Sequence, residues 1–207
     1  MKHLFSLCIP FAALLIFFTF GCGPNPEKLF DEGDSFLKSG QWEDAITNFG
    51  KVIDADPGHA KAYNGLGVAY SELGHQDKAL LNFDKALESG HAKGITNKLR
   101  ADILLSMNLN ERAADDYGKM LEFYPNSLEA LFGRAEANIN LHNFELAVED
   151  LDLAITTDYY EIGKHTLKSL NRGKLYYLRS EALQELGNQA QADEDLAKAC
   201  EIHKDYC

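Results

Sequence analysis

The chain has 207 residues, with 32 Asp and Glu against 20 Lys and Arg, and a formal net charge of −12 at pH 7. A protein whose main partner is a nucleic acid needs a basic surface, so this charge argues against that class of function. The hydrophobic fraction of 45% and the charged fraction of 25% are ordinary for a folded protein with an acidic, solvated surface.

The N-terminal segment has the pattern of a secretory signal. Lys2 is the only charged residue before Glu27, and a long apolar run follows it. A membrane-spanning helix is the alternative, but a span needs about 20 apolar residues. This run is shorter and contains Pro10. We therefore expect residues 1–21 to be a signal peptide.

The apolar run ends in a sequence that resembles a bacterial lipobox, whose cysteine becomes the lipid-modified first residue. Gly21 and Cys22 fit that motif, whereas Thr19 and Phe20 depart from the Leu and the small residue that it prefers. The resemblance implies lipid attachment at Cys22 and a lipidated tether over residues 22–27. A plainly secreted or anchored chain is the alternative.

A lipid on Cys22 would hold the protein at a membrane, because two or more acyl chains anchor stably. Gly23 stands where envelope lipoproteins carry an Asp retention signal. In a Gram-negative host this implies the outer membrane, facing the periplasm. The alternative location is secreted or periplasmic.

A 34-residue period runs from residue 26 to residue 161. Three repeated positions are Gly33, Gly67, Ala101 and Ala135; Ala45, Ala79, Ala113 and Ala147; and Phe49, Phe83, Tyr117 and Leu151. Such a period marks stacked supersecondary units, and the three- and four-residue apolar spacing within each unit predicts amphipathic helices. The units are 26–59, 60–93, 94–127 and 128–161, and a fifth fits at 173–206 after an 11-residue phase shift.

Each unit also carries a predicted turn between its two helices. Gly40, Gly74 and Gly187 stand where the backbone must take a left-handed conformation, which glycine adopts without steric cost. Asn108 is the next-best residue for that conformation in the third unit, and His142 is a poorer fit in the fourth.

The repeated positions resemble the motif of a known protein family. The second unit shows Tyr63, Leu66, Gly67, Tyr70, Ala79 and Phe83 at the spacing of the tetratricopeptide pattern W-x2-L-G-x2-Y and A-x3-F. The chain thus resembles the tetratricopeptide-repeat (TPR) family. The resemblance implies an all-α, right-handed α-solenoid of about five helix-turn-helix repeats. Such proteins usually bind extended peptides or partner helices in a concave groove.

The resemblance places positions five and nine of each unit in that groove. The candidates are Phe30, Asp34, Asn64, Lys98, Asp102, Phe132, Glu136, Tyr177 and Glu181. Acids fill most of the ninth positions, which favours a partner with basic and apolar side chains; an ordinary solvated groove is the alternative. The carboxylate clamp of some TPR proteins needs Lys, Asn and Arg at places that hold Phe30, Asp34, Gly65, Ile95 and Leu99 here, which excludes it.

The phase shift coincides with a basic insertion at 162–172. Its cluster is Lys164, His165, Lys168, Arg172 and Lys174. Eleven residues make almost three helical turns, so an insertion of that length can extend a helix without rotating its face. We expect the first helix of the fifth unit to start near Thr166; a loop is the alternative.

Two cysteines remain once Cys8 leaves with the signal and Cys22 takes lipid. Cys200 and Cys207 are similar to the cysteine pairs of disulfide-bearing helical repeats, which implies a bridge. Residues seven apart in a straight helix lie about 10.5 Å apart, too far for that bond. The helix must therefore end near His203 and the tail must fold back; two free thiols are the alternative.

No catalytic, cofactor or metal motif stands out in the sequence. The acidic clusters around Asp150 and Asp195 favour solvated helix faces, and Phe49, Phe83 and Tyr117 favour core packing. The hypothesis is a non-enzymatic, membrane-tethered scaffold that binds a peptide or partner helix, with a role in cell-envelope assembly. The alternatives are a secreted or anchored regulatory module of an enzyme complex and a self-associating structural protein.

Overall fold

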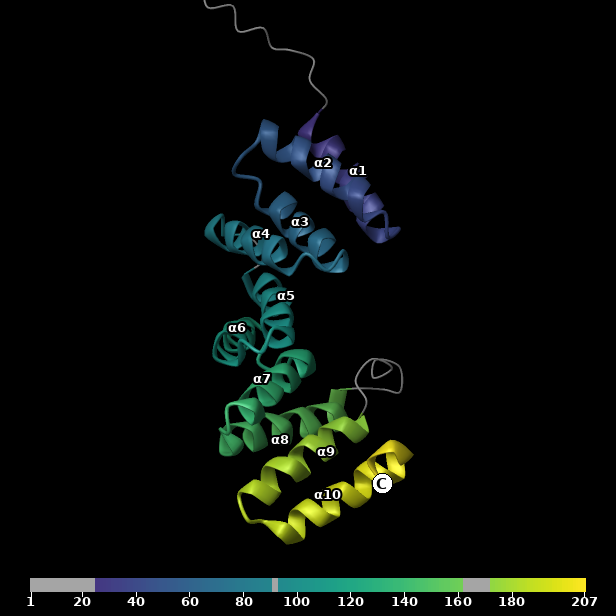
Figure 1. Cartoon of the computed structure of the whole chain (residues 1–207), viewed down its shortest axis with the longest axis vertical. Coiled ribbons are helices and arrows are strands. Elements are labelled where there is room, and N and C mark those ends of the chain that lie inside the picture. The colour runs from purple at the N-terminus through teal and green to yellow at the C-terminus, as the bar shows by residue number, and fades with distance from the viewer. Residues whose placement is uncertain (1–24, 91–92, 162–171) are drawn as a thin grey trace, which may run out of the picture.

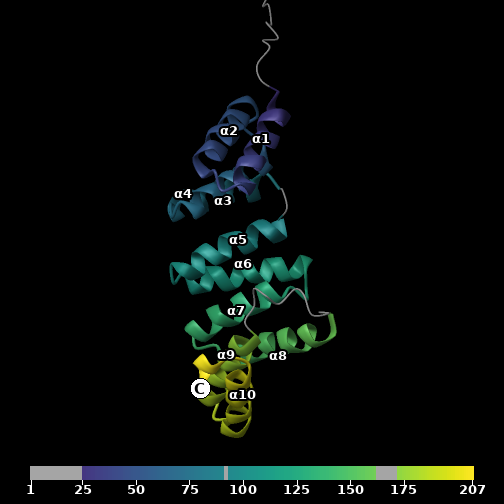
Figure 2. The same ribbon diagram turned by 90° about the vertical axis from the view of Figure 1, so that its right-hand side faces the viewer.

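The computed structural model describes residues 25–90, 93–161 and 172–207, and within these ranges the chain is all α-helical (Figure 1). The helices are α1 (Pro26–Lys38), α2 (Trp42–Ala55), α3 (Ala60–Glu72), α4 (Gln76–Glu88), α5 (Lys93–Ser106), α6 (Asn110–Phe123), α7 (Leu128–Asn140), α8 (Phe144–Glu161), α9 (Arg172–Glu185), α10 (Gln189–Ile202) and the short 3-10 helix η1 (Lys204–Tyr206). They form pairs stacked along one long axis (Figures 1 and 2), which confirms the predicted α-solenoid.

Several predictions of the sequence lie outside the described residues. They concern the signal peptide, Cys22, the helix start near Thr166, and Lys164, His165 and Lys168 of the basic cluster. In the part of the chain that is described, no helix combines the length and the apolar composition that a membrane span requires.

The two helices of each pair are joined by a tight turn through one residue with positive φ. These residues are Gly40, Gly74, Asn108, His142 and Gly187, as the sequence predicts. His142 adopts a φ of 60°, a conformation that costs energy for a residue with a Cβ. The turn geometry is therefore kept in the fourth unit even where the residue type is unfavourable.

Successive pairs interlock where an aromatic ring packs against glycine. The Phe49 ring is 1% exposed and lies between Gly33 of α1 and Gly65 of α3. A Cβ added at Gly33 would lie 2.8 Å from the ring, and one at Gly65 would lie 2.5 Å from it. One side chain thus fixes both its own pair and the next one.

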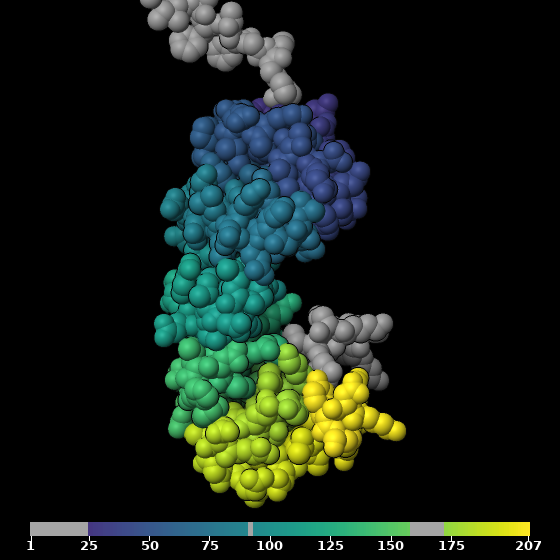
Figure 3. All heavy atoms as spheres, viewed as in Figure 1, coloured from purple at the N-terminus to yellow at the C-terminus, as the bar shows by residue number. Residues whose placement is uncertain are grey.

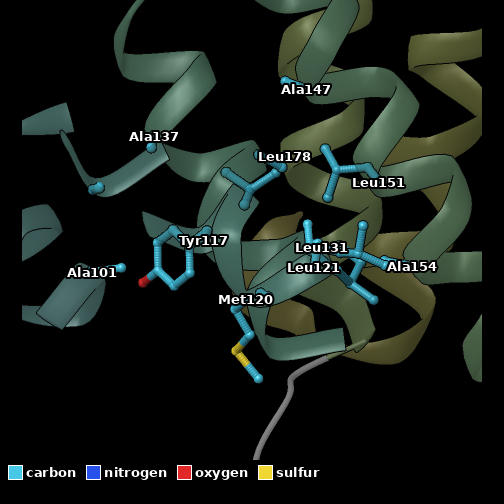
Figure 4. Close-up of a cluster of buried hydrophobic side chains, with 14 of the residues drawn as sticks. Ala101, Tyr117, Met120, Leu121, Leu131, Ala137, Ala147, Leu151, Ala154 and Leu178 are labelled. Carbon is cyan, nitrogen blue, oxygen red and sulfur yellow. The ribbon is translucent and has the colours of Figure 1, made fainter. Parts of the chain in front are cut away.

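The same arrangement recurs around the third pair. The Tyr117 ring of α6 packs against Gly133 of α7, which has no room for a Cβ. Figure 4 shows Tyr117 in one cluster with Leu131, Leu151 and Leu178, which come from α7, α8 and α9. Units three to five therefore share one continuous core.

Leu99 interrupts this pattern between the second and third pairs. It stands one period after Gly65 and one period before Gly133. Leu99 and Phe83 both line a hollow of about 220 Å³, and α4 and α5 contact each other less than the other consecutive α-helices of the described chain do. Because two large side chains meet where a ring and a glycine meet elsewhere, this junction is packed more openly.

The close packing of an aromatic ring against glycine predicts that the same substitution at two helical glycines has opposite effects on stability. Gly65→Ala should destabilise the protein, because overpacking against Phe49 costs about 1–3 kcal/mol and exceeds the gain in helix propensity. Gly50→Ala, in α2 with nothing within 4 Å of the new Cβ, should stabilise it by about 0.5–1 kcal/mol. Urea unfolding followed by circular dichroism measures both; equal effects would contradict the interlock.

Candidate functional site

The odd-numbered helices lie along one side of the stack, and this side is hollowed in the space-filling view (Figure 3). Two of its hollows are lined by described residues alone. One, of about 220 Å³, lies between α3 and α5, and the other, of about 360 Å³, lies between α5 and α7. Asp102 of α5 lines both, so the two hollows form one groove centred on this residue.

The α5–α7 hollow brings together four of the residues that the sequence assigns to the groove. They are Lys98, Asp102, Phe132 and Glu136. Leu105, Tyr117, Glu129 and Gly133 complete its lining. It therefore combines an aromatic ring with more carboxylates than cations, as a site for a basic and apolar segment requires.

Asp102 is held by two neighbours. Its Oδ1 accepts a hydrogen bond from the Tyr117 hydroxyl at 2.7 Å, and its Oδ2 lies 3.0 Å from Lys98 Nζ. Burial, together with the negative charge of Asp102, raises the pKa of Tyr117 well above its ordinary value, so the phenol stays protonated as a donor. The Asp102 side chain remains 43% exposed, and a carboxylate with two partners can accept further hydrogen bonds.

Sequence reasoning missed the role of Tyr117. It assigned the residue to the core with Phe49 and Phe83, and the ring is indeed 2% exposed. The residue type could have indicated this role. Tyrosine stands where the first two units have phenylalanine, and a buried hydroxyl needs a hydrogen-bond partner.

Glu136 is also engaged, by a lysine from the next unit. Lys174 Nζ lies 3.2 Å from Glu136 Oε1 and 4.9 Å from the centroid of the Phe132 ring. The sequence placed Lys174 in a basic patch with Arg172 and three residues outside the described part of the chain. Lys174 instead lies against the groove, where it bridges α9 and α7.

The remaining candidates near the N-terminus contact other residues of the first three units. The Phe30 ring packs against the rings of Phe49 and His59, and Asn64 donates a hydrogen bond to Thr96. Asp34 pairs with a lysine one turn along α1. None of these three candidates lines either hollow, so the structure does not bring them to the centre of the groove.

Tyr177 and Glu181 lie at the other end of the stack. The Tyr177 hydroxyl donates to Glu181 Oε1 at 2.9 Å, and this hydrogen bond raises the pKa of Tyr177. The Tyr206 ring is stacked on Tyr177 with centroids 5.0 Å apart. These residues are therefore separate from the central hollows.

The tail that carries Tyr206 is closed by a disulfide. Cys200 and Cys207 are bonded, with Cα atoms 4.9 Å apart. The helix α10 ends at Ile202, and the chain then folds back through η1. This is the backbone path that the seven-residue spacing requires.

Buried ion pairs were not predicted. In the last three units an arginine of the first helix forms two hydrogen bonds to an aspartate of the second, in the pairs Arg100–Asp116, Arg134–Asp150 and Arg179–Asp195. The interpretation of the acidic clusters as solvated faces is wrong for Asp150 and Asp195, which are 5% and 1% exposed. The signal was the constant 16-residue spacing at one repeat position.

These arginines connect the helices that carry the groove to the helices behind them. The Asp116 hydrogen bonds raise the pKa of Arg100, and Asp84 of the preceding unit contacts the same guanidinium. Asp152 contacts Arg179 in the same way. Each arginine therefore fixes its own helix pair, and two of the three also fix the preceding unit.

Neighbouring aspartates on α6 test this role. Asp116→Ala should lower the free energy of unfolding by about 3–5 kcal/mol, because Arg100 loses the partner that compensates its burial. Asp115→Ala, on an exposed side chain paired with Lys119, should cost no more than about 0.5 kcal/mol. Chemical unfolding of both variants measures the difference, and similar losses would exclude a special role for the buried pair.

A larger hollow of about 560 Å³ lies apart from the groove, near the end of α6. Ile95, Met120, Phe123, Tyr124, Pro125, Asn126 and Ser127 line it, so its lining is mostly apolar, with a few neutral polar groups and no charged side chain. The groove around Asp102 adds charged side chains that can orient a charged ligand. We therefore take the groove as the stronger candidate.

Two segments match family models for the tetratricopeptide repeat, residues 30–92 and residues 173–206. The second covers the same 34 residues as the fifth unit of the sequence period. The Arg100 and Arg134 pairs fall between the two matched segments.

Curated relatives share part of their length with this chain. It is 25% identical over 190 residues to the DnaJ homolog subfamily C member 3 of Bos taurus, which covers 89% of this chain and 38% of that protein. It is 29% identical over 133 residues to the Hsp70-Hsp90 organizing protein of Triticum aestivum, covering 60% of this chain and 22% of that protein. The chain thus spans well under half the length of these relatives.

Solved structures with a similar fold cover most of the chain. YrrB, described as a TPR protein with an unusual peptide-binding site, has a TM-score of 0.77 and 20% identity over 87% of this chain and 88% of its own. The MamA protein has a TM-score of 0.74 and 17% identity over 86% of this chain and 92% of its own. At these identities the likeness concerns the fold.

Proposed function

The chain is a tetratricopeptide-repeat protein, and on that premise we propose that it is a non-enzymatic scaffold that binds a protein segment in the groove along α3, α5 and α7. The observation that carries the proposal is the hollow where Asp102, Glu136 and Phe132 meet. A scaffold needs a groove with apolar surface and a few oriented polar groups, and this hollow offers both.

The lining residues define the chemistry of the partner. Glu72, Asp102, Glu129 and Glu136 line the two hollows, and Lys98 is the one cation among their lining residues. Phe132 already holds an ammonium group near its ring, which is the geometry of a cation–π contact. The groove therefore suits a segment with lysine or arginine beside an apolar side chain.

A partner that binds through a terminal carboxylate fits less well. The clamp positions hold Phe30, Asp34, Gly65, Ile95 and Leu99. Of these, Leu99 lines the α3–α5 hollow with apolar surface, and the carboxylates of Asp102 and Glu136 in the groove would repel a terminal carboxylate. We therefore assign this chain a basic partner rather than the acidic tail that such clamps receive.

Charge reversal in the groove tests the function. The probe is the fluorescein-labelled peptide Gly-Lys-Phe-Lys-Gly-Lys-Phe-Lys, and the protein is the full chain in detergent. Asp102→Lys combined with Glu136→Lys should weaken binding at least about tenfold in fluorescence anisotropy, since two attractive carboxylates become repulsive. Circular dichroism must show unchanged helix content.

The matched control reverses two exposed acids of α6. Asp115→Lys combined with Glu122→Lys changes the net charge equally and should leave the affinity within about twofold. A second control peptide carries Glu in place of every Lys. Equal loss in both double variants, or equal binding of the acidic peptide, would remove the groove from consideration.

We propose further that Cys22 carries lipid and tethers the repeats to a membrane of the cell envelope. In a Gram-negative host this is the outer membrane, and the repeats face the periplasm. The lipobox-like sequence supports this, as does the short distance in sequence from Cys22 to the start of α1 at Pro26. A disulfide between Cys200 and Cys207 fits an oxidising compartment. A tethered groove of this kind would serve envelope assembly.

Cys22→Ser tests the tether in cells. The native chain should incorporate labelled palmitate and enter the detergent-soluble membrane fraction, because acyl chains hold it there. Cys22→Ser should lose the label and the membrane association, whereas Cys8→Ser should keep both. Retention of the label by Cys22→Ser would exclude this residue as the attachment site.

A further inference from the structure

We propose that Tyr177 and Glu181 of α9 form an additional receptor for a lysine or arginine side chain, and that the tail closed by the Cys200–Cys207 disulfide covers it. The proposal rests on the function proposed for the groove and extends the groove by one unit. It assigns a ligand chemistry and a thiol-dependent control to the fifth unit.

An internal contact provides the template. Phe132 and Glu136 are four residues apart on α7, so their side chains share one face of the helix. Lys174 Nζ lies 4.9 Å from the Phe132 ring centroid and 3.2 Å from Glu136 Oε1. An aromatic ring and a carboxylate at this spacing therefore hold one ammonium group.

Tyr177 and Glu181 repeat this pair on α9. They occupy the same two positions of the fifth unit and are also four residues apart. The hydrogen bond from Tyr177 to Glu181 keeps the carboxylate beside the ring. Among the described residues, no lysine or arginine pairs with Glu181 or lies over the Tyr177 ring.

The Tyr206 ring takes the place that a cation would occupy. It is stacked on Tyr177 with an interplanar angle of 29° and a centroid separation of 5.0 Å. The corresponding contact in the first unit joins His59 to Phe30 at 5.2 Å. There the His59 ring is held from the other side, because its Nδ1 accepts the Ala62 N–H of the following helix α3.

Tyr206 is held in a different way. It belongs to η1, where Lys204 and Asp205 are exposed. Its ring meets the His203 ring edge-on, with centroids 5.9 Å apart, and the bond between Cys200 and Cys207 ties the tail to α10. The disulfide thus fixes the tail that carries this ring.

Reduction would release the tail. A dithiol reductant supplies two electrons and two protons, the Cys200–Cys207 bond becomes two thiols, and the dithiol becomes its own disulfide. The tail is then no longer tied to α10, and the Tyr206 ring can move away from Tyr177. The exposed ring and carboxylate match the template on α7 and attract a cationic side chain, while Glu181 repels an acidic one.

The test measures binding of fluorescein-labelled octalysine to the full chain in detergent. Cys207→Ser and, with the disulfide intact, Tyr206→Ala should each bind the peptide at least threefold more tightly than the native chain. Dithiothreitol should produce the same gain in the native chain and none in Cys207→Ser. Tyr206→Ala keeps the proposal testable if Cys207→Ser alters the fold of α10.

Glu181 must carry the gain. Adding Glu181→Gln to Cys207→Ser should return the affinity to that of the native chain, whereas Glu185→Gln, on an exposed residue of the same helix, should not. A gain that survives Glu181→Gln would overturn the proposal, as would the absence of any gain in both tail variants.

The same assay separates this proposal from that of the central groove. If Asp102→Lys with Glu136→Lys abolishes peptide binding but tail release gives no gain, the receptor on α9 fails and the groove function stands. If tail release gives a Glu181-dependent gain and the double variant has no effect, the groove proposal fails and the receptor on α9 stands.

Discussion

The contact on which the stack depends is an aromatic ring inserted between two helices that carry glycine. Phe49 lies between Gly33 and Gly65, and Tyr117 lies against Gly133. Because glycine has no Cβ, the neighbouring helix can approach the ring closely and leave few voids. Such close packing stabilises the fold. The distance between successive helix pairs, and with it the curvature of the groove, follows from this contact.

The groove is centred beside the place where that contact is modified. Leu99 replaces glycine at the junction of the second and third units, and the α3–α5 hollow lies there with Asp102 at its edge. The Arg100 guanidinium, bound by Asp84 and Asp116, spans the same junction from behind. A more open apolar contact is thus combined with a charged link between units.

Lysines partly neutralise the acidic side chains of the groove. Asp102 is paired with Lys98, and Glu136 with Lys174. The cations of a basic partner must compete with these lysines for the groove carboxylates, so the partner binds less tightly than the number of acids suggests. The same competition favours partners whose cations are correctly placed. Exposed ion pairs of this kind contribute about 0–1 kcal/mol, which makes such competition feasible.

The amino-acid sequence alone determined the architecture of this protein, because the repeat period depends on residue size and backbone conformation. The 34-residue phase located the helix pairs, and Gly40, Asn108 and His142 stand at the turns where the period places them. The resemblance to the tetratricopeptide-repeat family, which the same period carries, also implied the four groove residues that share the central hollow.

Only the tertiary structure decided which side chains are already partnered. Tyr117 reaches Asp102, Lys174 reaches Glu136, and Tyr206 covers Tyr177. The buried pairs of Asp150 and Asp195 with their arginines belong to the same class. These contacts join residues 15 to 38 positions apart, and they depend on how two helices cross and which way a long side chain turns. A period fixes the face of a helix, but not the reach of the side chains on it.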